Sequence, residues 1–483
     1  MKKVKSVACL LAAAIAASCT AGCSGGQTAA PSEAPSEASP ASSQVSEASS
    51  EASSAEAENP QDKYKAQDLG GRKFTFAYNW DMVPSTSADK LDSKTATEEQ
   101  IGKLANLKRI EKKYNCKIKY INVPYDQISE KLTTSVMANQ PFCDAINLST
   151  AQIYPAILGN QILPLEENVP DNSDLFHDKN VIYPVSYLGK AYAMAETGPA
   201  QSGQFIAFNR DIIKQLGMDA PDELYKKGEW TWDNFMKLAK AATKDTNGDG
   251  KIDQYGFGGT PGRAAPLFIA SNDGCLLDET DKKSGLDDPK TVEALEFVNK
   301  IYNVEKVGYI ANEINDYNSN DYSFKKGNIA MFYCEDWMLP TSDPKLSFKV
   351  GCAPAPKGPS NKTDNLYFKA EAGVCIPKGV KDPKIVAQVF EEVIDWCGGD
   401  FDEKSGTTMQ WLETLWPTED DVNMSVDISK KCGKVDYYSA IPDYPLGNVL
   451  NAFLHDGKTP AQAVEQNKQV AQSKVDAVFK NSK

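Results

Sequence analysis

The sequence lacks the motifs of the common hydrolases, metalloproteases and nucleotide-binding proteins. It has two histidines, His177 and His455, and neither belongs to an HExxH pattern or stands beside a partnered nucleophile. No GxSxG or GxGxxG segment occurs, and the Gly457-Lys458-Thr459 stretch has no upstream glycine of a phosphate loop. The chemistry carried by these motifs is therefore disfavoured.

Positive charge is in deficit. The chain has 52 Lys and Arg against 66 Asp and Glu, for a formal net charge of −14. No run of basic residues is interleaved with aromatics, and a polyphosphate backbone would be repelled by such a surface. We expect no nucleic-acid partner. The acidity suits a neutral or cationic solute, or solubility alone.

Closely spaced cysteines are also missing. The cysteines beyond residue 61 lie far apart without a CxxC pair, which disfavours zinc ribbons. Isolated cysteines in apolar segments, such as 351–353 and 374–376, are typical of small core residues. Disulfides are allowed outside the cell, so pairing stays open, and we assign no disulfide among Cys116, Cys143, Cys275, Cys334, Cys352, Cys375, Cys397 and Cys432.

No apolar run is long enough to cross a bilayer. The longest, residues 7–17, follows Lys2, Lys3 and Lys5. A helix of this length measures about 16 Å, roughly half of the ~30 Å hydrocarbon core. The pattern predicts a secretory signal peptide and not a transmembrane anchor.

The end of the signal, Thr20 to Cys23, resembles the bacterial lipobox, in which small residues precede a cysteine that receives diacylglycerol. The resemblance implies a signal peptide over 1–23, lipidation of Cys23 and anchoring to the outer face of the cell membrane. Thr20 departs from the usual leucine. Cys19 is an alternative site, and ordinary cleavage with release is a second alternative.

A low-complexity segment, residues 24–61, follows the signal. It consists mainly of Ser, Ala, Glu, Pro and Gly, and Val45 is its one aliphatic residue larger than alanine up to residue 60. Such a composition cannot bury enough apolar surface to offset the entropy of ordering. We predict a disordered tether with a root-mean-square span of about 35 Å.

The remaining residues, 62–483, have enough apolar content for two domains. Strand-like alternation at 73–78, a helical pattern at 98–114 and strand-like segments at 116–123 and 144–148 predict an α/β lobe with a parallel sheet. In such sheets ligands bind beyond the carboxyl ends of the strands. Further along, we expect a helix ending at Gly217, one capped by Thr231, and a last helix from Pro460.

Several segments in a fixed order resemble family 1 of the extracellular solute-binding proteins of ABC importers, the relatives of maltose-binding protein. They are residues 189–193, 208–217, 230–235, 245–258, 324–337, 353–358 and 456–464. The resemblance implies an α/β, two-lobed periplasmic-binding-protein-like fold of type II, with a hinge that the chain crosses more than once. We place lobe 1 at 62–200 plus 368–435 and lobe 2 at 201–367 plus 436–483.

The resemblance also implies the function. A monomeric, non-enzymatic protein would capture a small solute, with an oligosaccharide as the first choice, close around it and deliver it to ABC permease subunits. It would require no cofactor. Two alternatives remain: presentation of the solute to a membrane sensor kinase, and hydrolysis of a glycoside by two carboxylates in the cleft.

Sugars stack on aromatic rings while planar polar groups bind their hydroxyls, so residues of both types that follow strands are candidates for the solute site. Tyr78, Asn79 and Trp80 follow the first strand. Asp336 and Trp337 follow the strand near 329–333, where the family commonly places a stacking tryptophan. As an alternative, Trp337 covers the lobe edge and Asp336 caps a turn. Further candidates, which also suit solvated loops, are Thr150, Gln152, Glu196, Glu371, Trp411, Trp416 and Tyr444.

One acidic loop has the oxygen spacing of an EF-hand. Its ligands would be Asp245, Asn247, Asp249, Asp253 and the carbonyl of Lys251. Glycine stands where the bidentate glutamate belongs, at residue 256. We expect either a weak, structural calcium site or an acidic turn without metal.

Overall fold

The structure is a computed structural model. It describes residues 63–480 except 80–95, 97, 178–182, 188, 196–202, 279, 310–323, 336–337, 340–345, 369–371, 399–408, 411, 430 and 435–436. The predicted signal peptide, Cys23 and the predicted tether therefore lie outside the described residues.

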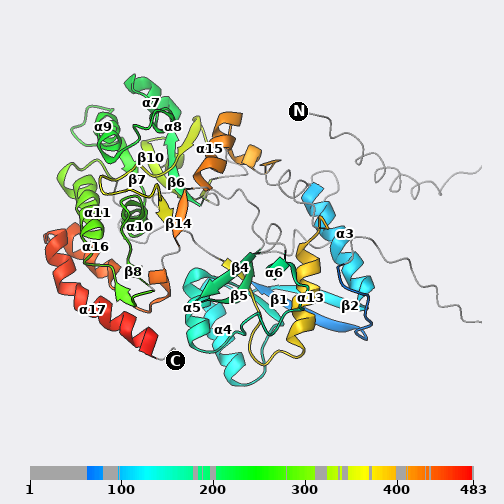
Figure 1. Cartoon of the computed structure of the whole chain (residues 1–483). Helices are drawn as coiled ribbons and strands as arrows, with labels where there is room; N and C mark the ends of the chain where they lie inside the picture. Colours follow the sequence, from blue (N-terminus) through cyan, green and yellow to red (C-terminus); the bar gives the residue numbers. More distant parts are fainter. Residues whose placement is uncertain are drawn as a thin grey trace, which may run out of the picture. The chain divides into compact units, whose positions relative to one another are not determined.

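The first sheet has the strand order β2-β1-β3-β13-β5-β4 (Figure 1). The strands β1 (Arg72–Tyr78), β2 (Cys116–Asn122) and β3 (Ala145–Ser149) are parallel, as the sequence predicts. The strand β13 (Ala372–Cys375) is antiparallel to β3 and β5 (Lys190–Ala195), and β4 (Tyr183–Tyr187) completes the far edge. One sheet edge thus holds the carboxyl ends of β1, β2 and β3.

Helices cover both faces of this sheet. Phe74 and Phe76 of β1 pack with residues of α3 (Glu98–Lys113) and α13 (Pro383–Ile394). On the other face, Ala77 and Ile146 pack with α4 (Tyr125–Met137) and α5 (Thr150–Leu158). The alternation along β1 sends successive side chains into these two cores.

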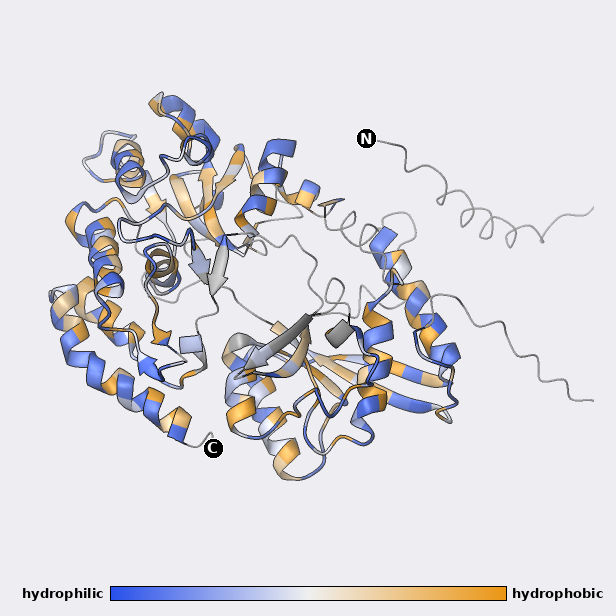
Figure 2. Cartoon of the chain, in the orientation of Figure 1, coloured by the Kyte–Doolittle hydropathy of each residue, from blue (hydrophilic) through white to orange (hydrophobic). Residues whose placement is uncertain are grey.

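The second sheet has the order β11-β6-β10-β7. The strands β6 (Gln204–Asn209) and β10 (Ile329–Glu335) are antiparallel, β11 (Val350–Ala353) is antiparallel to β6, and β7 (Tyr255–Gly258) is parallel to β10. Figure 2 shows apolar residues along these strands and polar residues on outer helical surfaces such as that of α17 (Pro460–Lys480). Apolar side chains thus lie between the sheet and its helices.

The helices predicted for this lobe are confirmed. The helix α7 (Arg210–Leu216) is capped by Asn209 and ends at Gly217, which has a φ of 63°. Thr231 caps α9 (Trp232–Ala242), whose buried residues include Trp232, Phe235, Met236 and Ala239. The remaining helices of at least six residues in the described part are α8 (Pro221–Lys226), α10 (Pro261–Ala270), α11 (Pro289–Asn299), α15 (Glu419–Ser429), α16 (Leu446–Leu454) and α17.

One predicted lobe boundary is wrong. Leu412, Trp416, Val422 and Ile428 belong to the hydrophobic core around the second sheet, although the sequence assigned residues up to 435 to lobe 1. Their apolar periodicity does not indicate which of two cores they join. Residues 412–429 therefore pack with lobe 2.

The chain passes between the two sheets repeatedly, as the resemblance implies. It passes from the first sheet to the second between β5 and β6, returns between β12 (Tyr367–Phe368) and β13, and crosses again between α13 and α15. The strand β12 pairs in parallel with β14 (Cys432–Lys434). A Cβ atom on Gly203 would lie 2.5 Å from the ring of Tyr367, so the connection between β5 and β6 runs close against β12.

Candidate functional site

The first sheet gathers several predicted positions at one edge. Asn79 directly follows β1, and Ala372 of β13 pairs with Ser149 at the end of β3. The strand β5 ends at Ala195 on the same edge, because it is antiparallel to β13. Trp80, Glu196 and Glu371, next to these ends, lie outside the described residues, and so does the side chain of Thr150.

Asn79 has the strongest local support among these candidates. Its side-chain oxygen is buried and has no hydrogen-bond partner within the described part of the chain. Buried polar atoms are nearly always paired, and an unpaired one costs about 1–3 kcal/mol. A donor from a bound solute would satisfy this oxygen.

In the structure, Tyr78 packs in the hydrophobic core and Gln152 caps a helix. Tyr78 is 2% exposed and packs near Tyr120 in the core, because it continues the inward alternation of β1. The Gln152 amide accepts from the Ser149 backbone N–H at 3.0 Å and donates to the Tyr125 carbonyl at 3.1 Å. This is a capping box of α5, and its S-x-x-Q pattern was readable in the sequence. A solute contact by Gln152 would have to replace these bonds.

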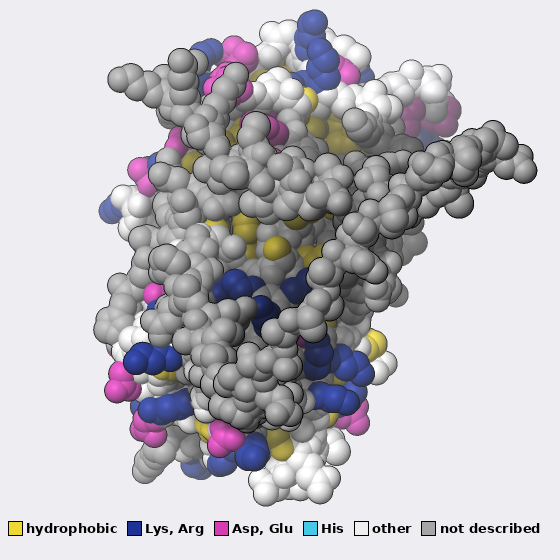
Figure 3. Space-filling view, turned by 90° about the vertical axis from the view of Figure 1, so that its right-hand side faces the viewer, with side chains coloured by type: hydrophobic (Ala, Val, Ile, Leu, Met, Phe, Trp, Pro, Cys, Tyr) yellow, Lys and Arg dark blue, Asp and Glu magenta, His cyan; other side chains and the backbone are white. Residues whose placement is uncertain are grey.

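Basic side chains lie at the opposite edge of the first sheet. Lys73, near the start of β1, is the direct neighbour of Lys117, near the start of β2, and both are exposed. In Figure 3, Lys and Arg side chains are frequent over the lower half of the view. Because the strands start at this edge and end at the other, the charge of these two lysines does not belong to the candidate site.

The second sheet also places polar groups where strands end. Glu335 ends β10 and pairs with Gln204 at the start of β6. One Glu335 carboxylate oxygen accepts from Arg263 of α10 at 2.7 Å and from the Tyr333 hydroxyl at 2.6 Å. Burial, followed by the Glu335 charge, raises the pKa of Tyr333 well above its usual value, so the phenol keeps its proton. Asp336 and Trp337 come next in the sequence and lie outside the described residues.

The weaker aromatic candidates either pack against other residues of lobe 2 or lie outside the described part of the chain. Trp416 is 3% exposed and its ring lies 5.5 Å from that of Phe205, although its indole N–H finds no hydrogen-bond partner in the described ranges. The Tyr444 hydroxyl donates to the Leu276 carbonyl at 2.6 Å and lies 2.8 Å from the Ser284 hydroxyl. Trp411 lies outside the described residues. Solute contacts by these three residues stay predictions.

The acidic loop is closed by its own backbone. Asp245 accepts N–H bonds from Gly248 at 2.6 Å and from Gly250 at 2.7 Å, and these bonds help to lower its pKa. Asp249 accepts from the Lys251 N–H at 2.8 Å. Within the described ranges, no group of three or more His, Cys, Asp or Glu is arranged to hold a metal ion. Calcium binding at this loop stays a prediction.

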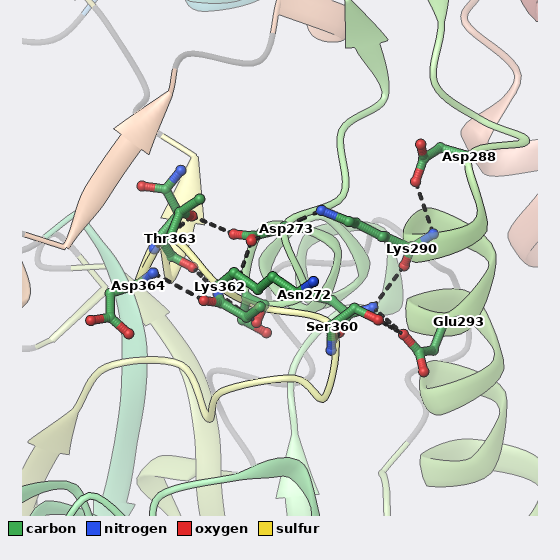
Figure 4. Close-up of polar contacts among 12 residues, drawn as sticks. Asn272, Asp273, Asp288, Lys290, Glu293, Ser360, Lys362, Thr363 and Asp364 are labelled. Carbon is green, nitrogen blue, oxygen red and sulfur yellow. Dashed lines mark hydrogen bonds and ion pairs between the residues drawn. The ribbon is translucent and has the colours of Figure 1, made fainter.

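A pocket of about 130 Å³ lies elsewhere in lobe 2, lined by Ala270, Asp273, Gly274, Lys290, Thr363, Asn365 and Tyr367. Figure 4 shows the polar contacts beside it. Asp273 bonds to Thr363 and accepts from the Lys362 N–H at 2.6 Å. Burial opposes ionisation of Asp273, but these bonds and the charge of Lys290 lower its pKa overall. The carboxylate thus fastens the loop 360–365, and no predicted site residue lines the pocket.

The family of the chain follows from its sequence. The family model described as bacterial extracellular solute-binding protein matches residues 92–399. The chain belongs to this family. Its members bind small solutes for ABC transporters and act outside the cytoplasm. No helix in the described part of this solute-binding protein is both long and apolar enough to span a membrane.

Solved structures share the two-lobed fold. A maltose/maltodextrin-binding domain from Bdellovibrio bacteriovorus, bound to maltotriose, matches 83% of this chain and 99% of its own at 17% identity, with a TM-score of 0.58. For an ABC substrate-binding protein from Listeria monocytogenes in complex with cycloalternan, the match covers 85% of this chain and 99% of that protein at 17% identity, with a TM-score of 0.58. For UgpB from Mycobacterium tuberculosis, in complex with glycerophosphocholine, the match covers 85% of this chain and 99% of that protein at 16% identity, with a TM-score of 0.60. A comparison with curated protein sequences gives no significant match.

Proposed function

We propose that this chain captures an oligosaccharide outside the cell and delivers it to the permease of an ABC importer. The observation that carries the proposal is the placement of polar groups at the strand ends of both sheets of a solute-binding fold. Asn79 stands at one such edge, and Gln204 with Glu335 stands at the other. Ligands of open α/β sheets bind at these edges.

Polyhydroxylated ligands in the related structures support the choice of solute. These ligands are maltotriose, in the maltose/maltodextrin-binding domain, and cycloalternan, in the ABC substrate-binding protein. A solute that contacts both lobes stabilises the closed form only through contacts that the open form lacks. The solute therefore holds the two lobes together in the closed form. The proposed function includes no cleavage of the solute.

The proposed attachment is a lipid on Cys23, followed by the tether 24–61. The tether would let the folded part stand about 35 Å or more from the membrane. Blocking lipidation with Cys23→Ala should move the protein from the membrane fraction to the soluble fraction, whereas Cys19→Ala should not. The opposite result would assign the lipid to Cys19.

A structural calcium ion in the acidic loop is a separate proposal, supported by its ligand spacing alone. Calcium should raise the melting temperature of the full chain, and a chelator should reverse the rise. An unchanged melting temperature in both conditions would remove the proposal.

A ligand screen with product analysis tests the main proposal. The full chain would be melted with neutral mono- to tetrasaccharides, alditols, amino sugars and peptides, and binding at about a hundredfold excess over Kd should stabilise by about 2.7 kcal/mol. Chromatography after prolonged incubation should return each bound sugar intact. Cleavage of a bound glycoside would instead show an enzyme, and a screen positive only for peptides would contradict the choice of solute.

A further inference from the structure

Gln204, Arg263 and Glu335 form a polar cluster at the edge of the second sheet where β10 ends. Glu335 and Gln204 are direct partners in the antiparallel pairing of β10 with β6, so their side chains leave the same face of the sheet. Tyr333 shares this face, two residues earlier on β10. Arg263 reaches Glu335 from the first turn of α10. We call Gln204, Arg263 and Glu335 the polar clamp.

Arg263 stands where helix electrostatics disfavour a cation. The amino terminus of a helix carries partial positive charge, and the first turn of α10 has no acidic residue. The compensating charge comes from Glu335, 72 residues away in sequence and 2.7 Å away in space. Residues that break the usual preferences of a helix or strand are found mainly at functional sites. The position of Arg263 therefore points to a role beyond helix stability.

The ion pair is held in place yet reaches the surface. The Arg263 side chain is 29% exposed and that of Glu335 is 17% exposed. The Tyr333 hydroxyl fixes the carboxylate by a 2.6 Å bond. A guanidinium offers several donors in one plane, and a carboxylate offers acceptors. Neighbouring hydroxyls of a polyol, each both donor and acceptor, match the two groups together.

Gln204 adds a buried acceptor to the polar clamp. Its side-chain oxygen has no hydrogen-bond partner among the residues that the structure describes. Such oxygens are nearly always paired in folded proteins, with protein groups or with ordered water. A solute hydroxyl at this edge supplies the missing donor beside the ion pair.

We propose that Gln204, Arg263 and Glu335 contact the solute directly and select a neutral, polyhydroxylated molecule. The inference rests on the proposed function, which places the solute at this edge. The charges of Arg263 and Glu335 cancel, so a charged solute gains no net attraction from the clamp. Removing either charge should therefore shift selectivity toward a solute of the opposite sign to the charge that remains.

Calorimetric titration of the full chain tests the clamp, with neutral mono- to tetrasaccharides and alditols as probes, and glucuronic acid and glucosamine as charged counterparts. The wild type should bind at least one neutral probe, and Arg263→Met, Glu335→Gln and Gln204→Leu should each weaken that binding about tenfold or more. Glu335→Gln should favour glucuronic acid relative to the wild type, and Arg263→Met should favour glucosamine. The control is Lys240→Met, which removes a 2.6 Å ion pair with Glu305 elsewhere in lobe 2.

The outcomes separate the two proposals. Unchanged affinity in all three clamp variants, with a wild type that binds a neutral probe, overturns the clamp and leaves the proposed function standing. A wild type that binds only charged probes overturns the neutral solute class. A wild type that binds none of the probes overturns the proposed function as well. Gln204→Leu removes a buried oxygen that has no partner among the described residues and should keep the wild-type melting temperature, so it carries the test should an ion-pair variant fail to fold.

Discussion

The guanidinium of Arg210 is hydrogen-bonded to the carboxylate of Asp421, whose side chain is 1% exposed. Arg210 also donates to Asp222 of α8 at 2.9 Å. These bonds tie α15 to the start of α7, and they explain why the late segment joins lobe 2. Removing one member of a buried ion pair destabilises a protein strongly, because the other charge stays buried without a counter-charge.

We therefore expect Arg210→Met to lower the free energy of unfolding by about 3 kcal/mol. The control is Lys226→Met, which removes an exposed 3.1 Å pair with Asp420 between α8 and α15. That change should cost less than about 1 kcal/mol. Urea unfolding of both variants measures the difference, and equal costs would show that the Arg210 bonds do not hold α15.

Glu391 should make the protein less stable as the pH rises. Burial raises the pKa of Glu391 above its usual value, although the Tyr64 hydroxyl at 2.5 Å and the Ser173 hydroxyl bond to its carboxylate. Because its folded-state pKa is raised, Glu391 contributes folding stability that is complete below about pH 4.5. This stability is lost as the pH rises through the folded-state pKa. Glu391→Gln should remove this loss and be more stable than the wild type at pH 7.

The neighbouring carboxylate provides the control for this prediction. Glu392 accepts from Lys113 at 2.6 Å, and both side chains are 5% exposed. Glu392→Gln weakens a buried ion pair and should destabilise at pH 7 by about 3 kcal/mol. Unfolding free energies at several pH values test both variants. A Glu391→Gln variant with the pH dependence of the wild type would contradict the assignment.

Gly203 should tolerate a side chain less well than Gly228. Both have positive φ, 66° and 74°, so alanine strains the backbone at either position. A Cβ atom at Gly203 also meets the Tyr367 ring at 2.5 Å, whereas nothing lies within 4 Å at Gly228. We expect Gly203→Ala to cost about 1–3 kcal/mol more than Gly228→Ala. Thermal melting of both, and of Gly203→Ala with Tyr367→Leu, measures this, and equal melting temperatures would refute the close contact.

Trp337 tests the stacking role that the resemblance implies. We expect Trp337→Ala to weaken solute binding by about 1–3 kcal/mol, as for the loss of a buried aromatic contact. Trp230→Phe is a suitable control, because Trp230 is 3% exposed and its N–H donates to the Pro354 carbonyl at 2.7 Å in the lobe 2 core. An unchanged dissociation constant in Trp337→Ala would place its ring outside the site.

Local patterns carried most of the fold prediction. The parallel order of β1, β2 and β3 follows from alternation and helix spacing, and the predicted stop at Gly217 and cap at Thr231 lie beside the helices that they end and start. These features depend on residues a few positions apart. The family resemblance added the two-lobed arrangement and the repeated crossings, which periodicity alone does not specify.

The site was harder to predict because it depends on contacts distant in sequence. Arg263 and Glu335 are 72 residues apart, and neither stands in a recognisable motif. Tyr78 was expected at the solute, but its place in the alternation of β1 sends it into the core. Gln152 was also a candidate, and its role in the α5 cap was readable as a capping box. Only the tertiary structure shows that residues 412–429 pack in the core of lobe 2 and not in that of lobe 1.

Hydrogen exchange of the full chain, with and without the tightest-binding neutral oligosaccharide, tests the central claim most directly. The account predicts slower exchange at both strand-end edges, near 78–80 and 148–152 in lobe 1 and near 258–263 and 333–337 in lobe 2. The edge holding Lys73 and Lys117 and the acidic loop 245–253 should not change. Protection confined to one lobe, or to the pocket beside Asp273, would contradict binding by closure of two lobes around one solute.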